Sequence, residues 1–141
     1  MNICVLFLEG TFCFFMKLPL ISWNVRDLNN PQKRESIKHW LRSWKCDAVC
    51  LQETKLEVVD LQLVRSLWGS PYVDWDFLPA IGSAGGVLMI WDTRVLEKIN
   101  SMVKTFSVSC HWKGVADGLE WVGSGLYGLR MICFAASCGR S

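Results

Sequence analysis

The chain has little net charge, little proline and few histidines, and each shortage excludes a class of protein. Its 141 residues carry 15 Lys and Arg against 13 Asp and Glu, so the net charge of +2 supports no global attraction to nucleic acid. Charged residues make up 20% and hydrophobic residues 51%, which excludes an intrinsically disordered chain. With 4 Pro and 11 Gly, the sequence is neither collagen-like nor of low complexity. The length predicts one domain with one hydrophobic core.

The seven cysteines do not form a recognisable metal or disulfide framework. Cys46 and Cys50 have the spacing C-x3-C, and Cys133 and Cys138 have the spacing C-x4-C. Neither pair has a second ligand pair at a zinc-finger spacing, and the chain has 2 histidines. The pattern predicts reduced, mostly buried thiols in an intracellular protein, nuclear or cytoplasmic.

The first residues are apolar but do not match a signal peptide. The runs 3–8 and 12–16 are separated by Glu9, no Lys or Arg precedes them, and no A-x-A pattern follows. A membrane helix here would contain Glu9 within its span, which costs about 2.5–3.5 kcal/mol for a charge at the helix centre. We therefore expect residues 1–16 to be an apolar extension. A membrane anchor is the less favoured alternative, which membrane fractionation would test.

Hydrophobic spacing then predicts a β-α-β unit. Residues 18–24 have the pattern of a strand, in which Pro19 is acceptable near the start or on an edge. Asn30 is a suitable N-cap and Pro31 a suitable first residue for the helix that follows. An apolar stripe at i, i+3, i+4 and i+7 is expected to face the core, formed by Ile37, Trp40, Leu41 and Trp44. Residues 48–51 then have the pattern of a buried strand.

The rest of the chain predicts mainly strands. A second helix is expected over residues 60–68, and strands are expected over 72–78, 87–91, 97–103, 105–112 and 119–127. The residues SAGG at 83–86 predict a tight turn, or alternatively a loop that approaches a phosphate. A βαβα order followed by consecutive strands indicates an α+β protein with layered sheets.

Basic residues gather on the outer side of the first predicted helix. They are Lys33, Arg34, Lys38, Arg42 and Lys45. Such a side is ordinarily a solvated helix face. The alternative is a surface that binds nucleic acid.

The chemically suggestive residues follow the two strands of the β-α-β unit. Parallel neighbouring strands bring their carboxyl ends to one edge of a sheet, so Asn24 and Glu53 are expected to lie together. A carboxylate beside a carboxamide oxygen suits Mg²⁺, which takes one or two carboxylates, keeps water and accepts phosphate oxygens. The alternative is two ordinary polar strand ends, with Asn24 in a turn and Glu53 solvated.

These same positions carry a family resemblance. The segments ISWNVR at residues 21–26 and VCLQETK at residues 49–55 resemble the first two motifs of the endonuclease/exonuclease/phosphatase superfamily, which includes DNase I and the exonuclease III-type apurinic endonucleases. The sequence is most similar to the endonuclease domain of plant LINE-type, non-LTR retrotransposons. That similarity also includes NPQKR at 30–34, SAGGV at 83–87, and residues 121–128.

The resemblance covers residues 17–128 and leaves 129–141 as an unaligned tail. It implies an α/β fold, an incomplete four-layered α/β/β/α sandwich of the DNase I-like type. It implies Mg²⁺-dependent hydrolysis of a DNA phosphodiester, with Glu53 and Asn24 holding the metal and Asn24, Glu53 and Tyr127 as catalytic residues. Weak Mg²⁺ binding is expected in this chain, because the metal site would rest on Glu53 with the neutral Asn24 as its partner. DNA contacts are expected from Arg26, Lys33, Arg34 and Lys38. No membrane or obligate protein partner is implied. Without the family, Tyr127 would be taken as a half-buried strand aromatic.

Departures from the family pattern bear on activity. Leu129 follows Tyr127-Gly128 where the family has proline, and Asp27 stands where relatives usually have glycine. The Gly-Asp-Phe-Asn-like and Ser-Asp-His-like motifs, which supply a catalytic Asp, an Asn and the Asp–His pair, do not occur in the 141 residues. The sequence therefore predicts a truncated, catalytically incomplete endonuclease relic. The alternative is a non-catalytic module that binds nucleic acid or protein through the basic helix 31–45.

Overall fold

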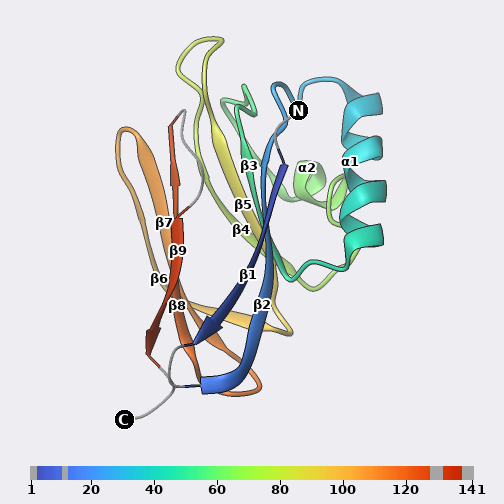
Figure 1. Cartoon of the computed structure of the whole chain (residues 1–141). Helices are drawn as coiled ribbons and strands as arrows, with labels where there is room; N and C mark the ends of the chain where they lie inside the picture. Colours follow the sequence, from blue (N-terminus) through green and yellow to red (C-terminus); the bar gives the residue numbers. More distant parts are fainter. Residues whose placement is uncertain (1–2, 11–12, 128–131, 138–141) are drawn as a thin grey trace.

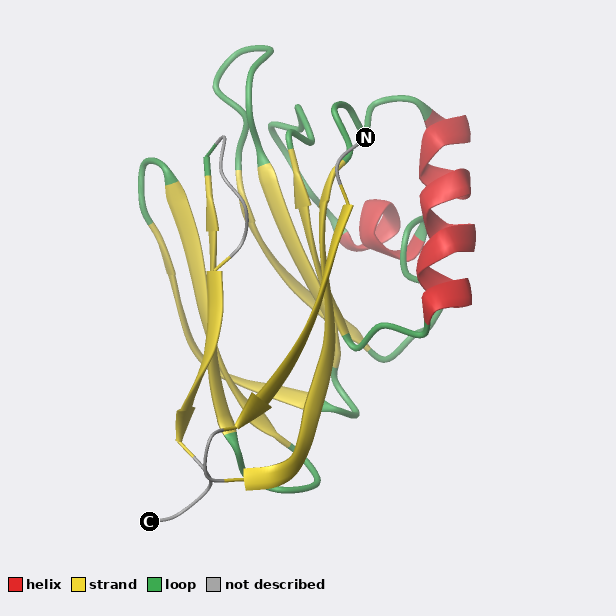
Figure 2. Cartoon of the chain, viewed as in Figure 1, coloured by secondary structure: helices red, strands yellow, loops and turns green. Residues whose placement is uncertain are grey.

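Two β-sheets lie face to face, and two helices lie on the outer side of one of them (Figures 1 and 2). The computed structural model describes residues 3–10, 13–127 and 132–137, with side chains described from Leu20 to Tyr127. The first sheet is mixed, has the strand order β1-β2-β3-β5-β4, and consists of β1 (Ile3–Gly10), β2 (Cys13–Asn24), β3 (Ala48–Gln52), β5 (Val87–Asp92) and β4 (Val73–Leu78). The second is antiparallel and consists of β6 (Leu96–Val103), β7 (Ser107–Gly114), β8 (Glu120–Leu126) and β9 (Ile132–Ser137).

The β-α-β unit has the predicted form. Strands β2 and β3 are parallel neighbours, with Leu20 opposite Ala48 and Asn24 opposite Gln52. Helix α1 (Pro31–Trp44) connects them, and the Asn30 side chain accepts the N–H of Gln32 at 2.9 Å, as an N-cap does. The helix ends at Lys45, whose left-handed backbone (φ 50°) forms the C-cap. Asn24 and the residue after Gln52 therefore leave the sheet at the same edge.

Several element boundaries differ from those predicted. Strand β2 begins at Cys13 rather than at residue 18, because β1 pairs with it from Cys13 to Trp23, an interaction that local periodicity does not report. Pro19 lies inside β2 but precedes Leu20, the first residue that pairs with β3. At Pro19 the strand therefore has β1 as its one hydrogen-bonding neighbour, so the missing N–H of proline is tolerated there. The second helix, α2, is limited to Leu61–Arg65 instead of residues 60–68. Strand β9 lies in the tail that could not be aligned; Gly128, residues 129–131 and residues 138–141 are outside the described part.

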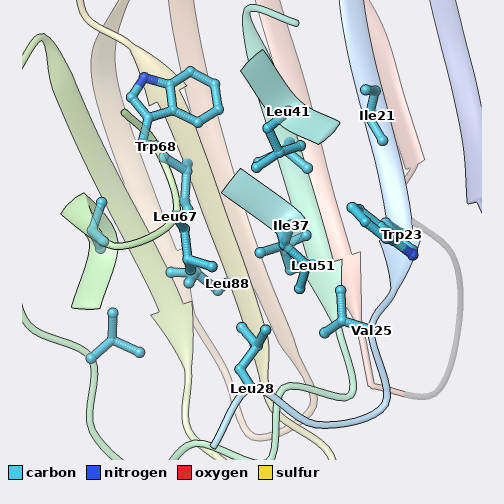
Figure 3. Packing of buried hydrophobic residues seen from close by; sticks show 14 of the residues in the cluster. Ile21, Trp23, Val25, Leu28, Ile37, Leu41, Leu51, Leu67, Trp68 and Leu88 are labelled. Carbon is cyan, nitrogen blue, oxygen red and sulfur yellow. The ribbon is translucent and has the colours of Figure 1, made fainter. Parts of the chain in front are cut away.

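The core consists of two layers. Between α1, α2 and the first sheet lie Ile21, Trp23, Ile37, Leu41 and Leu51, all nearly inaccessible to solvent (Figure 3). Alternate residues of β2 and β3 point the other way, toward the second sheet. There the buried Trp91 and Trp112 rings meet edge to face, with centroids 5.5 Å apart. The two-sided burial explains why β3 and β5 are buried along their whole length and apolar up to their last residues, Gln52 and Asp92.

One member of the predicted core stripe is at the surface. Trp40 is 47% exposed, whereas Ile37 and Leu41 are buried. Trp40 lies at the border of the stripe and stacks on Trp44 at 5.7 Å, and Trp44 in turn contacts Trp23 at 5.3 Å. The apolar stripe is wider than the surface that the sheet covers.

These features make the chain an α/β sandwich, as predicted. Both described helices lie on the five-stranded sheet, so the described residues form three of the four layers (Figure 2). Among these residues, no helix has the length and apolar character needed to cross a membrane.

Candidate active site at one edge of the sandwich

The structure brings the ends of β2 and β3 together as predicted. Asn24 is the last residue of β2, and the N–H of Val25 donates to the carbonyl of Gln52 at 3.0 Å. Glu53 is the next residue after Gln52, and its side chain is partly exposed. The two candidate residues therefore leave adjacent parallel strands at the upper edge in Figure 1.

The backbone at this edge has an unusual conformation. Arg26, Glu53 and Lys55 have φ values of 64°, 54° and 58°, in the left-handed region that non-glycine residues avoid. Each such residue costs on the order of 1–3 kcal/mol and persists where the surrounding contacts determine it. The N–H of Leu28 donates to the carbonyl of Thr54 at 2.9 Å, which ties the two strand exits to each other.

Asp27 does not prevent this turn. Its carboxylate accepts the backbone N–H of Asn29 at 2.8 Å and the Asn29 side-chain amide at 3.0 Å. The backbone hydrogen bond from Asn29 is the main cause that lowers the pKa of Asp27 below its ordinary 3.8. The positive φ that a glycine would accommodate falls on the preceding residue, Arg26.

Gly85 and Gly86 join the exit of β3 to the second sheet. The carbonyl of Gly85 accepts the N–H of Lys55 at 2.7 Å, and that of Gly86 accepts the N–H of Thr54 at 3.2 Å. A Cβ atom on Gly85 would fall on the ring of Tyr127, and one on Gly86 would fall on the hydroxyl of Thr54. The two glycines therefore allow the loop backbone to pack closely against Tyr127 and Thr54. Turn chemistry alone predicts a tight connection but not these contacts.

Tyr127 thus reaches the same edge from the other sheet. It directly follows β8, and its N–H donates to the carbonyl of Phe106 at 2.8 Å. Its ring meets the Phe106 ring edge to face, with centroids 5.9 Å apart. The ring rests against Gly85, whose carbonyl is bonded to the segment that follows Glu53. Phe106 also belongs to this site, although no sequence pattern pointed to it. Gly85 lies in the segment 83–86, for which the sequence predicts a tight turn, or alternatively a loop that approaches a phosphate.

The donors at this edge fit a hard divalent cation. Glu53 supplies a carboxylate and Asn24 an amide oxygen; Asn24 Oδ1 also accepts the N–H of Arg26 at 3.1 Å and keeps a second lone pair. Within the described residues there is no group of three or more His, Cys, Asp or Glu that could hold a metal. An ion here would take its remaining ligands from water or phosphate, as Mg²⁺ commonly does.

The predicted basic residues have different environments. Arg26 is exposed at the edge, beside Asn24. Arg34 donates from Nε to the carbonyl of Leu28 at 2.7 Å and from Nη2 to that of Asn29 at 3.2 Å, so its guanidinium holds the loop before α1. Lys33 and Lys38 lie on α1, partly exposed. Arg34 therefore has a structural role beside its predicted contact with nucleic acid.

Neither histidine lies on the strands that end at the candidate residues. His39 is exposed on α1. His111 lies on β7, with Nε2 2.8 Å from a carboxylate oxygen of Glu120 on β8.

A second group of charged side chains surrounds a hollow of about 370 Å³ at the opposite end of β3. The residues that line it include Arg42, Lys45, Asp47, Asp92 and Arg94.

The comparisons with known proteins agree with this architecture. The model of the Endonuclease/Exonuclease/phosphatase family matches residues 21–128, and the chain belongs to this family. Among solved structures it is similar to the AP endonuclease LMAP from Leishmania major, with a TM-score of 0.50 and 17% identity. That match covers 67% of this chain and 35% of the other, so the chain spans about a third of that enzyme. No curated protein matches the sequence.

Proposed function

We propose that this chain carries the metal- and phosphate-binding part of a DNA phosphodiesterase site. In this proposal it corresponds to the N-terminal part of a Mg²⁺-dependent endonuclease of a LINE-type retrotransposon. The observation that carries the proposal is the convergence of Asn24, Glu53 and Tyr127, from the ends of three strands in two sheets, at one edge.

Each residue has a definite task in this proposal. Glu53 holds the metal, and Asn24 supplies a neutral oxygen beside it. When bound, a divalent cation would act as a Lewis acid that neutralises charge developing on phosphate oxygens. Tyr127 donates a hydrogen bond from its phenol to a phosphate oxygen or to the attacking water. Arg26, exposed at the same edge, would contact a neighbouring phosphate of the DNA strand.

The same proposal includes catalytic incompleteness of the 141-residue chain. Phosphodiester hydrolysis needs a base for water and assistance for the leaving group, and general acid–base catalysis contributes typically ~10²–10⁴-fold. His39 and His111 lie on α1 and β7, away from the strand ends that carry Asn24 and Glu53. We therefore expect this chain to bind metal and DNA without appreciable turnover.

The proposed retrotransposon origin rests on sequence alone. Its support is the similarity of NPQKR at 30–34 and SAGGV at 83–87 to LINE endonucleases. The genomic sequence after the codon for Gly128 tests it. If another reading frame there encodes the Gly-Asp-Phe-Asn-like and Ser-Asp-His-like motifs, the origin is supported and the tail 129–141 is a frameshift or splice product.

The function is tested by DNA binding and nicking with the same protein. The affinity for a labelled duplex is measured by fluorescence anisotropy with Mg²⁺ and with EDTA, for the parent and for Glu53→Gln. We expect Mg²⁺ to strengthen binding by the parent and not by the variant. Equal affinity under all four conditions would contradict a metal–phosphate site. Nicking of supercoiled plasmid that disappears in Glu53→Gln would contradict catalytic incompleteness, whereas equal low nicking by both would indicate a contaminating nuclease.

A second candidate function is metal-independent nucleic-acid binding by α1. Lys38 and Arg42 lie on the flank of α1 that faces Gly69, and Arg42 and the C-cap residue Lys45 line the hollow at the end of β3. Cations three and four residues apart on a helix form a row that phosphates can follow. Replacing all three by Gln should weaken DNA binding equally with Mg²⁺ and with EDTA and flatten its salt dependence. An unchanged salt slope would leave this face as a solvated one.

A further inference from the structure

We propose that Gly85 is a positioning residue for Tyr127, and that its missing side chain sets where the Tyr127 phenol lies at the site edge. This inference rests on the proposed function for its catalytic meaning. Its geometric part stands on the described contacts alone. It also adds a residue from the loop between β4 and β5, which the roles of Asn24, Glu53 and Tyr127 do not include.

The contact between Gly85 and Tyr127 leaves no room for a side chain. A Cβ atom built on Gly85 would collide with Cε2 and Cζ of the Tyr127 ring and would lie 2.5 Å from its hydroxyl oxygen. Real Cβ atoms essentially never approach other heavy atoms below 3.0 Å, so the ring would have to move. The three atoms named are at the hydroxyl end of the ring. Any residue other than glycine would therefore displace the functional group itself.

Gly85 is itself fixed to the segment that carries Glu53. Its carbonyl accepts the N–H of Lys55 at 2.7 Å, two residues beyond Glu53. The next residue, Gly86, accepts the N–H of Thr54 at 3.2 Å and packs directly on the Thr54 hydroxyl. A rigid chain of contacts therefore runs from the Glu53 segment through Gly85 to the Tyr127 ring.

Phe106 confines the same ring by a second contact. The two rings meet edge to face at 5.9 Å, and the Phe106 carbonyl accepts the Tyr127 N–H at 2.8 Å. Phe106 is 60% exposed, so its contact with Tyr127 is at the surface. Gly85 contributes the close backbone contact that a side chain at that position would abolish.

Gly82 is a matched control in the same loop. Its φ of +62° is close to the +77° of Gly85, so alanine is conformationally strained at both positions. A Cβ on Gly82, however, would meet nothing within 4 Å. A comparison of Gly85→Ala with Gly82→Ala therefore separates the loss of the Tyr127 contact from backbone strain.

Fluorine NMR of protein labelled with meta-fluorotyrosine tests the position directly. The chain has 2 tyrosines, so two resonances are expected, and Tyr72→Phe assigns them. We expect Gly85→Ala to shift the Tyr127 resonance and leave that of Tyr72 in place, and Gly82→Ala to move neither. An unmoved Tyr127 resonance in folded Gly85→Ala, or an equal shift in Gly82→Ala, would overturn the proposal.

A double-mutant cycle keeps the test valid if Gly85→Ala is unstable. Because the collision is with the Tyr127 ring, Gly85→Ala should lower the thermal midpoint less in a Tyr127→Ala background than in the parent. An equal fall in the thermal midpoint in both backgrounds would show that the two residues are not coupled and would overturn the proposal.

Mg²⁺-dependent DNA binding then tests the functional part. Gly85→Ala and Tyr127→Phe should each weaken it by about tenfold, the size expected for one hydrogen bond to a charged group. A shifted Tyr127 resonance with unchanged DNA affinity would retain the positioning contact and contradict the proposed role of Tyr127.

Discussion

The thiol of Cys110 on β7 donates a hydrogen bond to the carboxylate of Asp76 on β4, with Sγ 3.4 Å from Oδ2, and so connects the two sheets. The same oxygen lies 3.3 Å from Nζ of Lys98 on β6. Asp76 is thus the point at which three strands from two sheets meet through polar groups.

We predict that Asp76→Ala destabilises the protein by about 1–3 kcal/mol, because it leaves a partly buried ammonium group and a buried thiol without their acceptor. Urea unfolding followed by tryptophan fluorescence measures the loss. Asp74→Ala is the control on the same strand, since the Asp74 carboxylate accepts the backbone N–H of Trp75, its own neighbour. An equal loss of unfolding free energy in both variants would show that the hydrogen bond between the sheets stabilises the protein no more than the local bond of Asp74 does.

We predict that stability falls at alkaline pH because of buried thiols. Burial raises the pKa of Cys46 from its ordinary 9.0 to about 12, and burial together with Asp76 raises the pKa of Cys110 as well. The contribution of Cys46 is complete below pH 9, where the unfolded thiol is protonated, and it disappears as pH rises toward about 12. In that window the loss is about 1.4 kcal/mol per pH unit for each thiol.

Urea unfolding between pH 8 and pH 11, in roughly unit steps, checks this slope. Cys46→Ala should have a shallower decline than the parent, because one of the two thiols has been removed. A parallel decline in both proteins would exclude Cys46 as a cause. Among the described residues, Cys46, Cys50 and Cys110 are buried thiols outside any disulfide.

We predict opposite effects from the two aspartates in the hollow at the far end of β3. Burial, and then the charge of Asp92, raise the pKa of Asp47, so its ionised form is disfavoured in the folded protein. Its contribution to stability is complete below the unfolded pKa of about 3.9 and is lost as pH rises. Asp47→Asn should therefore stabilise the protein at neutral pH and change little at about pH 3.

Asp92→Asn should do the reverse. Burial alone would raise the pKa of Asp92, but the side-chain and backbone hydrogen bonds of Arg94 outweigh it and lower the pKa. That contribution is present above the unfolded pKa and is lost as pH falls, so the variant should be less stable at neutral pH. Thermal melts at both pH values measure the difference, and a stabilising Asp92→Asn would contradict the assigned ion pair.

We predict that the protein is poorly soluble when expressed alone. Strand β6 is at the edge of the second sheet, and Ile99 and Met102 on it are 49% and 54% exposed. Exposed apolar edge strands associate with one another. Ile99→Lys/Met102→Lys should raise the soluble fraction after centrifugation, whereas Val115→Lys, 57% exposed in the β7–β8 turn, should not. A monomeric parent with a sharp, reversible thermal transition would contradict the prediction.

Local sequence patterns predicted the elements that position Asn24 and Glu53. The Asn30 N-cap, Pro31 and the apolar stripe located α1, and the apolar run at Ala48 located β3. Two parallel strands joined by one helix must end at the same edge, so the relation between Asn24 and Glu53 followed from chain order and sheet geometry. Periodicity did not reveal that Trp40 is exposed, because it reports which face is apolar and not how much of that face is covered.

The sequence by itself determined the strands and helix of the β-α-β unit, the family motifs and the residue types at the strand ends, because each of these is encoded in a short segment of the chain. Only the tertiary structure decided that Tyr127 lies on Gly85, 42 positions away, and that Cys110 reaches Asp76. Such contacts depend on how one sheet is placed over the other. That placement is set by the packing of Trp91, Trp112 and their buried neighbours, to which no single segment of sequence corresponds.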